Sequence, residues 1–293
     1  MSKLTRSLLV FVASAVSVGA AQQQPSPAAD QAPIVVTGDK ISNDAIRTFV
    51  RDLTRARSNA QLRRFEHSVC PLALGLPQEQ RDVVENRIRL VANEVGISVA
   101  NPKCAPNLLL IVAADKPAVM EELRRHYVYV YGDVSGNRIR DLIRSPDPVA
   151  AWQIDGPPMT DGRDIPTDFG SGLTVNRTTA RGSRITAAAY PQFSAAVVIV
   201  ARDALAGLTT TQLADYVTLR ALTGADPARL TKSGPSTILH AIDAPEGSEV
   251  PITMTEWDLA FLRGYYDARR NLSPAAQRSA ITKTVADAPK QEK

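Results

Sequence analysis

Apolar residues recur along the chain at two spacings, and these predict where helices and strands lie. A recurrence every three or four positions marks amphipathic helices. The helices predicted in this way cover residues 43–61, 77–96, 115–126, 135–146, 209–224 and 256–266. Apolar runs of strand character predict strands at residues 65–76, 107–115, 184–190 and 194–203. Strands and helices follow one another from residue 65 onward, which favours an α+β domain with helices packed on a mixed sheet.

Local signals fix several of the helix ends. Asp115, followed by Pro117, is a typical helix start, and Gly96 offers a left-handed helix end. The helix over 256–266 has Thr255 and Asp258 at the spacing of a capping box.

Three segments lack the periodicity of packed elements. Residues 22–42 are largely rich in Gln, Pro and Ala and predict a disordered spacer, and residues 273–293 predict a frayed polar tail. Residues 155–184 are rich in Gly, Pro, Asp, Thr and Ser, which predicts a long surface loop or a boundary between two lobes. We therefore expect a single domain over 43–272.

The N-terminus is typical of a secretory signal peptide. Lys3 and Arg6 precede an apolar stretch too short to span a membrane stably, and small residues near Ala20 and Ala21 suit cleavage. Residues 1–21 are therefore expected to be removed, leaving a periplasmic or secreted protein without a transmembrane segment.

The charge pattern argues against nucleic acid as a partner. The formal net charge of +4 falls to about +2 when Lys3 and Arg6 are removed, because 4 − 2 = 2. Basic residues form no block and do not alternate with aromatic residues, as a nucleic-acid surface requires.

Cys70 and Cys104 are the only cysteines in the chain. In an oxidising compartment, two cysteines most simply form one disulfide. A redox or metal-binding pair is the alternative, but the wide spacing and the lack of a Cys-x-x-Cys motif argue against it.

Motifs of known catalytic chemistry are missing from the sequence. His67, His126 and His240 are the three histidines, and no two have the spacing of an H-E-x-x-H motif. No G-x-S-x-G elbow occurs, and Ser236, four residues before His240, is better explained as part of a turn. The sequence therefore assigns no catalytic residue, metal ligand or cofactor.

The C-terminal part resembles the end of metzincin-type zinc peptidases. There, a Ser-Ile-Met turn lies beneath the metal and precedes a helix of pattern Leu-Thr-x-x-Asp-x-x-x-Leu-x-x-Leu-Tyr. In this chain Thr237-Ile238-Leu239 stands at the turn, and the helix pattern is matched at Met254, Thr255, Asp258, Leu262 and Tyr266.

The helix upstream of that turn resembles a zinc-binding helix that has lost its ligands. "RALTGAD" is similar to the His-Ala-Leu-Gly-Leu-x-His portion of the active helix. In that register, Tyr216 and Arg220 replace the two helical histidines, Val217 replaces the general-base glutamate and Asp226 replaces the third ligand. An arginine would place a fixed positive charge at the metal position, so the resemblance implies loss of zinc catalysis.

The chain resembles even more closely a family of proteobacterial envelope proteins of unknown function with a degenerate zincin-like pattern. The resemblance implies a zincin-like mixed sheet with packed helices and an exported, catalytically silent protein. Its partner would be an unknown envelope component, with a cleft floored by the helix that carries Tyr216 and Arg220.

The ligand-binding candidates are Tyr216, Arg220, Asp226 and His240. Arg220 would bind an anionic group such as a carboxylate or a peptide C-terminus; the plainer alternative is an ordinary ion-paired arginine. Two other functions stay open: a divergent hydrolase with an unrecognised site, for example in 155–184, and a purely structural envelope protein.

Overall fold

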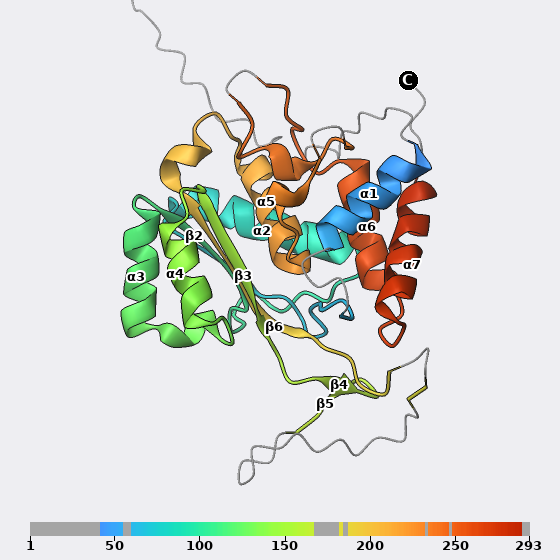
Figure 1. Cartoon of the computed structure of the whole chain (residues 1–293). Helices are drawn as coiled ribbons and strands as arrows, with labels where there is room; N and C mark the ends of the chain where they lie inside the picture. The colour runs from blue at the N-terminus through green and yellow to red at the C-terminus, as the bar shows by residue number, and fades with distance from the viewer. Residues whose placement is uncertain are drawn as a thin grey trace, which may run out of the picture.

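Four strands form one mixed sheet at the centre of the computed structural model, which describes residues 42–54, 60–166, 182–183, 187–231, 234–245 and 248–288. The sheet order is β1 (Pro71–Leu74), β2 (Leu108–Ala113), β6 (Phe193–Ala201) and β3 (Val149–Asp155) (Figure 1). The first three strands are parallel, and β3 runs antiparallel to β6 at the edge. A separate two-stranded hairpin joins β4 (Met159–Thr160) to β5 (Arg163–Asp164).

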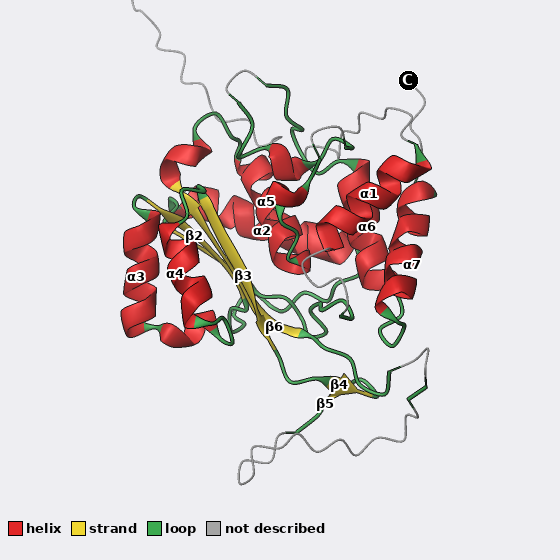
Figure 2. Ribbon diagram, viewed as in Figure 1, coloured by secondary structure: helices red, strands yellow, loops and turns green. Residues whose placement is uncertain are grey.

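Helices cover both faces of the sheet, as Figure 2 shows. On one face lie α3 (Lys116–His126) and α4 (Gly136–Arg144), which pack on a smaller apolar core around Trp152 and Ile199. On the other face lie α2 (Gln78–Glu94) and α5 (Thr210–Thr223), and beyond them α6 (Glu256–Asp267), α7 (Pro274–Ala286) and α1 (Asn43–Thr54). These helices share the larger apolar core with the sheet. Within the described residues, the fold has seven α-helices and a mixed sheet, so the predicted α+β class and mixed sheet are confirmed.

The predicted helix ends are confirmed where local signals fixed them. The side chain of Asp115 accepts a hydrogen bond from the Ala118 N–H at the start of α3. Thr255 and Asp258 form a complete capping box at the start of α6, and Gly96 has a left-handed φ of 76° after α2. Short single-turn helices, η3 (Val128–Tyr131), η4 (Arg202–Leu205), η5 (Pro227–Arg229) and η6 (Ile238–His240), complete the described elements.

Strand β2 shows why a continuous apolar run predicts a strand buried on both faces. Leu108, Leu110 and Val112 enter the larger core, whereas Ile111 and Ala113 enter the smaller one. Successive side chains of a strand point to opposite faces, so both faces of β2 need apolar residues.

One strand was missed, and one strand prediction is wrong. The segment 149–155 forms β3, which was not predicted, because its hydrogen-bonding partner β6 lies about forty residues later. The expected strand over 184–190 is not formed in its described part, 187–190, which contributes only an isolated bridge between Tyr190 and Met159.

The frayed tail predicted over 273–293 is also wrong in part, because residues 274–286 form α7. Ser273 caps this helix, and Gln277, Ile281 and Val285 are buried. Gly264 lets α6 approach it closely, since a Cβ at this position would lie 3.1 Å from the Ile281 Cα. Within the expected loop, residues 159–164 form the β4–β5 hairpin, whereas residues 167–181 lie outside the described residues, as do the expected signal peptide and nearly all of the expected spacer.

The predicted disulfide between Cys70 and Cys104 is confirmed, with 6.1 Å between the two Cα atoms. It ties the start of β1 to the loop that leads into β2. No helix in the described part of the chain has the length and apolarity needed to cross a lipid bilayer.

Candidate functional site

Helix α5 carries Arg220 in its last turn, and its two ends are fixed by the sequence. Thr209 and Gln212 form a reciprocal capping box at the start. Gly224 ends the helix in the left-handed region, with φ 70°, and a Cβ there would meet the Gln153 Oε1 atom at 2.9 Å. A glycine is therefore needed at position 224 both for the backbone turn and for the close approach of α5 to strand β3.

The Arg220 guanidinium is mostly buried and only partly neutralised. The residue is 8% exposed, and its Nη1 atom lies 3.7 Å from the Asp226 Oδ1 atom, a long ion pair. Its guanidinium carbon lies 5.8 Å from the centroid of the Tyr216 ring, within the range of a cation–π contact. Among the described residues, the Nε atom has no hydrogen-bond partner. Arg220 is thus an ion-paired arginine that keeps one buried donor unused.

Tyr216 lies behind Arg220 in the core rather than at an open surface. The residue is fully buried, and its hydroxyl also lacks a hydrogen-bond partner within the described part of the chain. Burial raises the pKa of Tyr216 to about 12, because the nearby Arg220 charge offsets only part of the desolvation of a phenolate. Tyr216 therefore presents a neutral ring face to the guanidinium.

Asp226 follows the end of α5 and forms ion pairs with two arginines, Arg220 and Arg229. Its side chain caps η5 by accepting a hydrogen bond from the Ala228 N–H, and its Oδ2 atom lies 3.3 Å from the Arg229 Nε atom. Asp226 therefore lies between Arg220 of α5 and Arg229 of η5 as the acid that pairs with both.

His240 belongs to the same electrostatic neighbourhood through Asp243. Burial lowers the pKa of the half-buried His240, and the charge of Asp243 opposes this. Burial raises the pKa of Asp243, which the positive charge of Arg220 counteracts, while Asp147 and Asp226 reinforce the rise. Asp243 and Asp147 were not among the predicted residues, because no local motif marks them.

A cleft with a volume of about 600 Å³ opens beside the end of α5. Of the four predicted residues, Arg220 and Asp226 line it, whereas Tyr216 and His240 do not. Its other wall is strand β3 with the start of α4; the residues that contribute are Asp133, Val134, Ser135, Arg138, Leu142, Asp147, Val149, Ala151, Trp152 and Gln153. The cleft thus lies between α5 and the sheet edge, and the helix that was expected to floor it contributes Arg220 to the lining but not Tyr216.

The wall formed by β3 is an unpaired strand edge. The Ala201 N–H donates to the Pro148 carbonyl at 2.8 Å, so residue 148 belongs to a hydrogen-bonded pair. Hydrogen-bonded and non-hydrogen-bonded pairs alternate in an antiparallel ladder, and the backbone groups of residues 148, 150, 152 and 154 therefore bond to β6. The backbone N–H and C=O groups of Val149, Ala151 and Gln153 therefore point away from β6. Within the described residues, no hydrogen bond to these groups is formed. These same three residues line the cleft.

The turn at Thr237-Ile238-Leu239 is tied to the closing helix by Asp258, which is fully buried. One carboxylate oxygen accepts from the Thr237 hydroxyl at 2.5 Å, and the other from the Ile238 N–H at 2.9 Å and the Thr255 N–H at 3.0 Å. The aspartate of the Thr-x-x-Asp pattern thus joins the turn to α6. This helix buries Trp257, Phe261 and Tyr265 along one stripe.

No three His, Cys, Asp or Glu side chains come together in a metal-binding arrangement within the described residues. Comparisons with family models, with curated proteins and with solved structures give no match for this chain.

Proposed function

We propose that this protein is an exported binding protein on a catalytically silent zincin-like scaffold, and that its cleft takes an extended peptide segment with a carboxylate against Arg220. One observation carries the proposal: residues of the unpaired edge of β3 and the buried Arg220 line the same cleft.

The order of elements supports the zincin-like scaffold. A strand, a helix, an apolar strand, a later strand, a degenerate helix, a Thr-Ile-Leu turn and a Thr-x-x-Asp helix follow one another as β1, α2, β2, β6, α5, η6 and α6. Arg220 and Asp226, which occupy ligand positions in the resemblance, meet at the cleft.

The edge of β3 supports an extended peptide as the ligand. A strand edge offers N–H and C=O groups in alternation, and a peptide that adds to it satisfies both. Val149, Ala151 and Gln153 provide up to three residues of such pairing. The charged residues of the lining are balanced, with Arg138, Arg220 and Arg229 against Asp133, Asp147 and Asp226, so the proposed carboxylate contact rests on the buried Arg220.

Binding of short peptides tests this proposal. A pool of tetrapeptides with free C-terminal carboxylates should bind, whereas the same pool with C-terminal amides should bind at least about tenfold more weakly, the size expected for loss of one charge-assisted contact. Arg220→Ala should remove this difference between the two pools. Arg263→Ala removes an arginine that pairs with Glu94 outside the cleft and should leave binding unchanged.

The strand edge is tested separately from the arginine. Ala151→Pro removes one N–H that faces the cleft without removing a bond to β6, so it should weaken binding while the fold persists. N-methylated peptides, which cannot donate to the edge, should lose affinity for the unaltered protein in the same way. Equal binding of both peptide pools by the unaltered protein, or full binding by Ala151→Pro, would contradict the proposal.

A further inference from the structure

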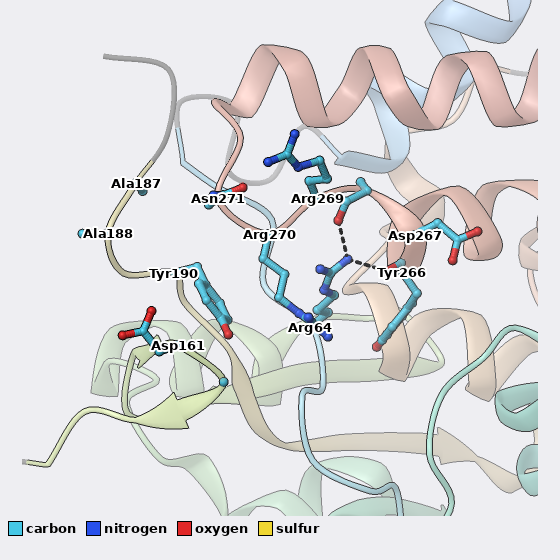
Figure 3. A pocket seen from close by; sticks show the side chains of 12 residues that line it. Arg64, Asp161, Ala187, Ala188, Tyr190, Tyr266, Asp267, Arg269, Arg270 and Asn271 are labelled. Atoms are coloured by element: carbon cyan, nitrogen blue, oxygen red, sulfur yellow. Dashed lines mark hydrogen bonds between the residues drawn. The ribbon is translucent and has the colours of Figure 1, made fainter. Parts of the chain in front are cut away.

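A second hollow, which shares no residue with the cleft, lies where α6 ends. Its volume is about 520 Å³, and Figure 3 shows the side chains around it. Three arginines reach it from two parts of the chain: Arg64 from the segment before β1, and Arg269 and Arg270 from the turn between α6 and α7. Tyr190 faces them from the opposite wall.

Arg64 is held rigidly at the base of this hollow. It is 5% exposed, and its Nη1 atom donates to the Tyr265, Tyr266 and Ala268 carbonyls at 2.6–2.9 Å. These carbonyls belong to the end of α6, so Arg64 satisfies the acceptors that a helix leaves open there. Its Nε atom donates to Glu66 at 2.8 Å.

Glu66 also fixes Arg270. The second oxygen of the buried Glu66 carboxylate, Oε2, lies 2.6 Å from the Arg270 Nε atom. One carboxylate therefore forms ion pairs with two guanidinium groups, those of Arg64 and Arg270. Two like charges are therefore held side by side with only one compensating charge between them. Their geometry is set before any ligand arrives.

Several donors in the hollow are unused within the described residues. The Arg64 Nη2 atom, the Arg269 guanidinium, the Tyr190 hydroxyl and the Asn271 side-chain amide make no hydrogen bond there. In Figure 3, the Tyr190 hydroxyl points toward Arg64 and Arg270. The two acidic residues in the lining, Asp161 and Asp267, extend away from these arginines at opposite ends of the view.

We propose that this hollow binds a small oxyanion, a phosphate or a carboxylate group, against the prearranged Arg64 and Arg270 guanidinium groups and the Tyr190 hydroxyl. Planar guanidinium groups match the geometry of both anions, and a phenol and an amide add neutral donors. The binding of this anion is independent of the peptide proposed for the cleft.

Thermal unfolding of the full mature chain with added sodium phosphate or sodium acetate, against sodium chloride at equal ionic strength, tests the site. A bound anion raises the unfolding temperature in a saturable way, which yields its dissociation constant. Phosphate stabilisation would identify a phosphate site, and acetate stabilisation a carboxylate site. Arg270→Ala should weaken the preferred anion about tenfold, the usual effect of losing one charged hydrogen bond, and Tyr190→Phe should weaken it several-fold.

Two variants serve as controls. Arg263→Ala changes a neighbouring arginine of α6 that does not line the hollow, and should bind the anion normally. Arg220→Ala should also bind it normally, even if peptide binding at the cleft fails. The proposal is overturned if neither anion stabilises the protein beyond chloride, or if Arg270→Ala and Tyr190→Phe both retain full affinity.

Discussion

Asp258 is a single buried carboxyl group that should make the stability of the protein depend on pH. Burial raises its pKa from 3.8 to about 6, although hydrogen bonds from Thr237, Ile238 and Thr255 oppose the shift. The folded state therefore holds this proton more tightly than the unfolded state. The stabilisation from the protonated group is complete below about pH 4 and is lost as the pH rises through about 6, by up to about 3 kcal/mol.

Denaturant unfolding of wild type and Asp258→Asn from pH 4 to pH 7 measures this effect, because the asparagine does not titrate. The difference in unfolding free energy between the two proteins should shrink as the pH rises. A difference that grows with pH would mean that the hydrogen bonds outweigh desolvation and that the carboxylate is the favoured form.

Single residues of the candidate site were predictable only in part. The resemblance to a zinc-binding helix brought out Arg220 and Asp226, which do meet at the cleft. It could not show that Tyr216 faces the core, because α5 is buried on nearly all sides and its sequence has no distinct polar face. Asp243 and the edge of β3 lie far from Arg220 in sequence, and only the folded chain brings them near.

At the scale of elements, one buried ion pair connects α2, α5 and the segment that leads into α6. Asp215 accepts from the Arg87 Nε atom at 2.8 Å and the Arg87 Nη2 atom at 3.0 Å, and also from the Thr253 hydroxyl at 2.6 Å. Both charged residues are almost fully buried. Removing one partner leaves the other charge buried and uncompensated, which typically costs about 3–5 kcal/mol.

We therefore expect Arg87→Met to lower the free energy of unfolding by about 3–5 kcal/mol. The double variant Arg87→Met with Asp215→Leu should lose clearly less than the sum of the two single variants, because it leaves no unpaired charge. Chemical denaturation of the four proteins in one double-mutant cycle measures the coupling. Additive losses would show that the pair acts only through packing.

Elements were predictable where their signals are local. Capping residues and terminal glycines mark α2, α3, α5 and α6, and each of these helices forms within a few residues of its predicted range. Strand β3 and helix α7 depend instead on distant partners. The stretch 149–155 becomes a strand by pairing with β6, and the Ala- and Lys-rich stretch 274–286 becomes a helix because its few buried side chains pack against neighbouring helices such as α6.

At the scale of the whole molecule, the disulfide limits how far the unfolded chain can expand. Cys70 and Cys104 are separated by 34 positions, and the loop that they close includes α2. The chain-entropy model gives about 4 kcal/mol for a loop of this length. Replacing both cysteines by alanine should therefore lower the free energy of unfolding by up to this amount, and a reductant should destabilise the wild type but not the variant. If the reductant leaves the wild type as stable as before, the loop is already ordered in the unfolded state and the cross-link contributes little.

Because α2 packs on both β1 and α5, we expect the loss of stability on removal of the disulfide to be global. Hydrogen exchange of the α5 amides should therefore rise together with that of the β1 amides.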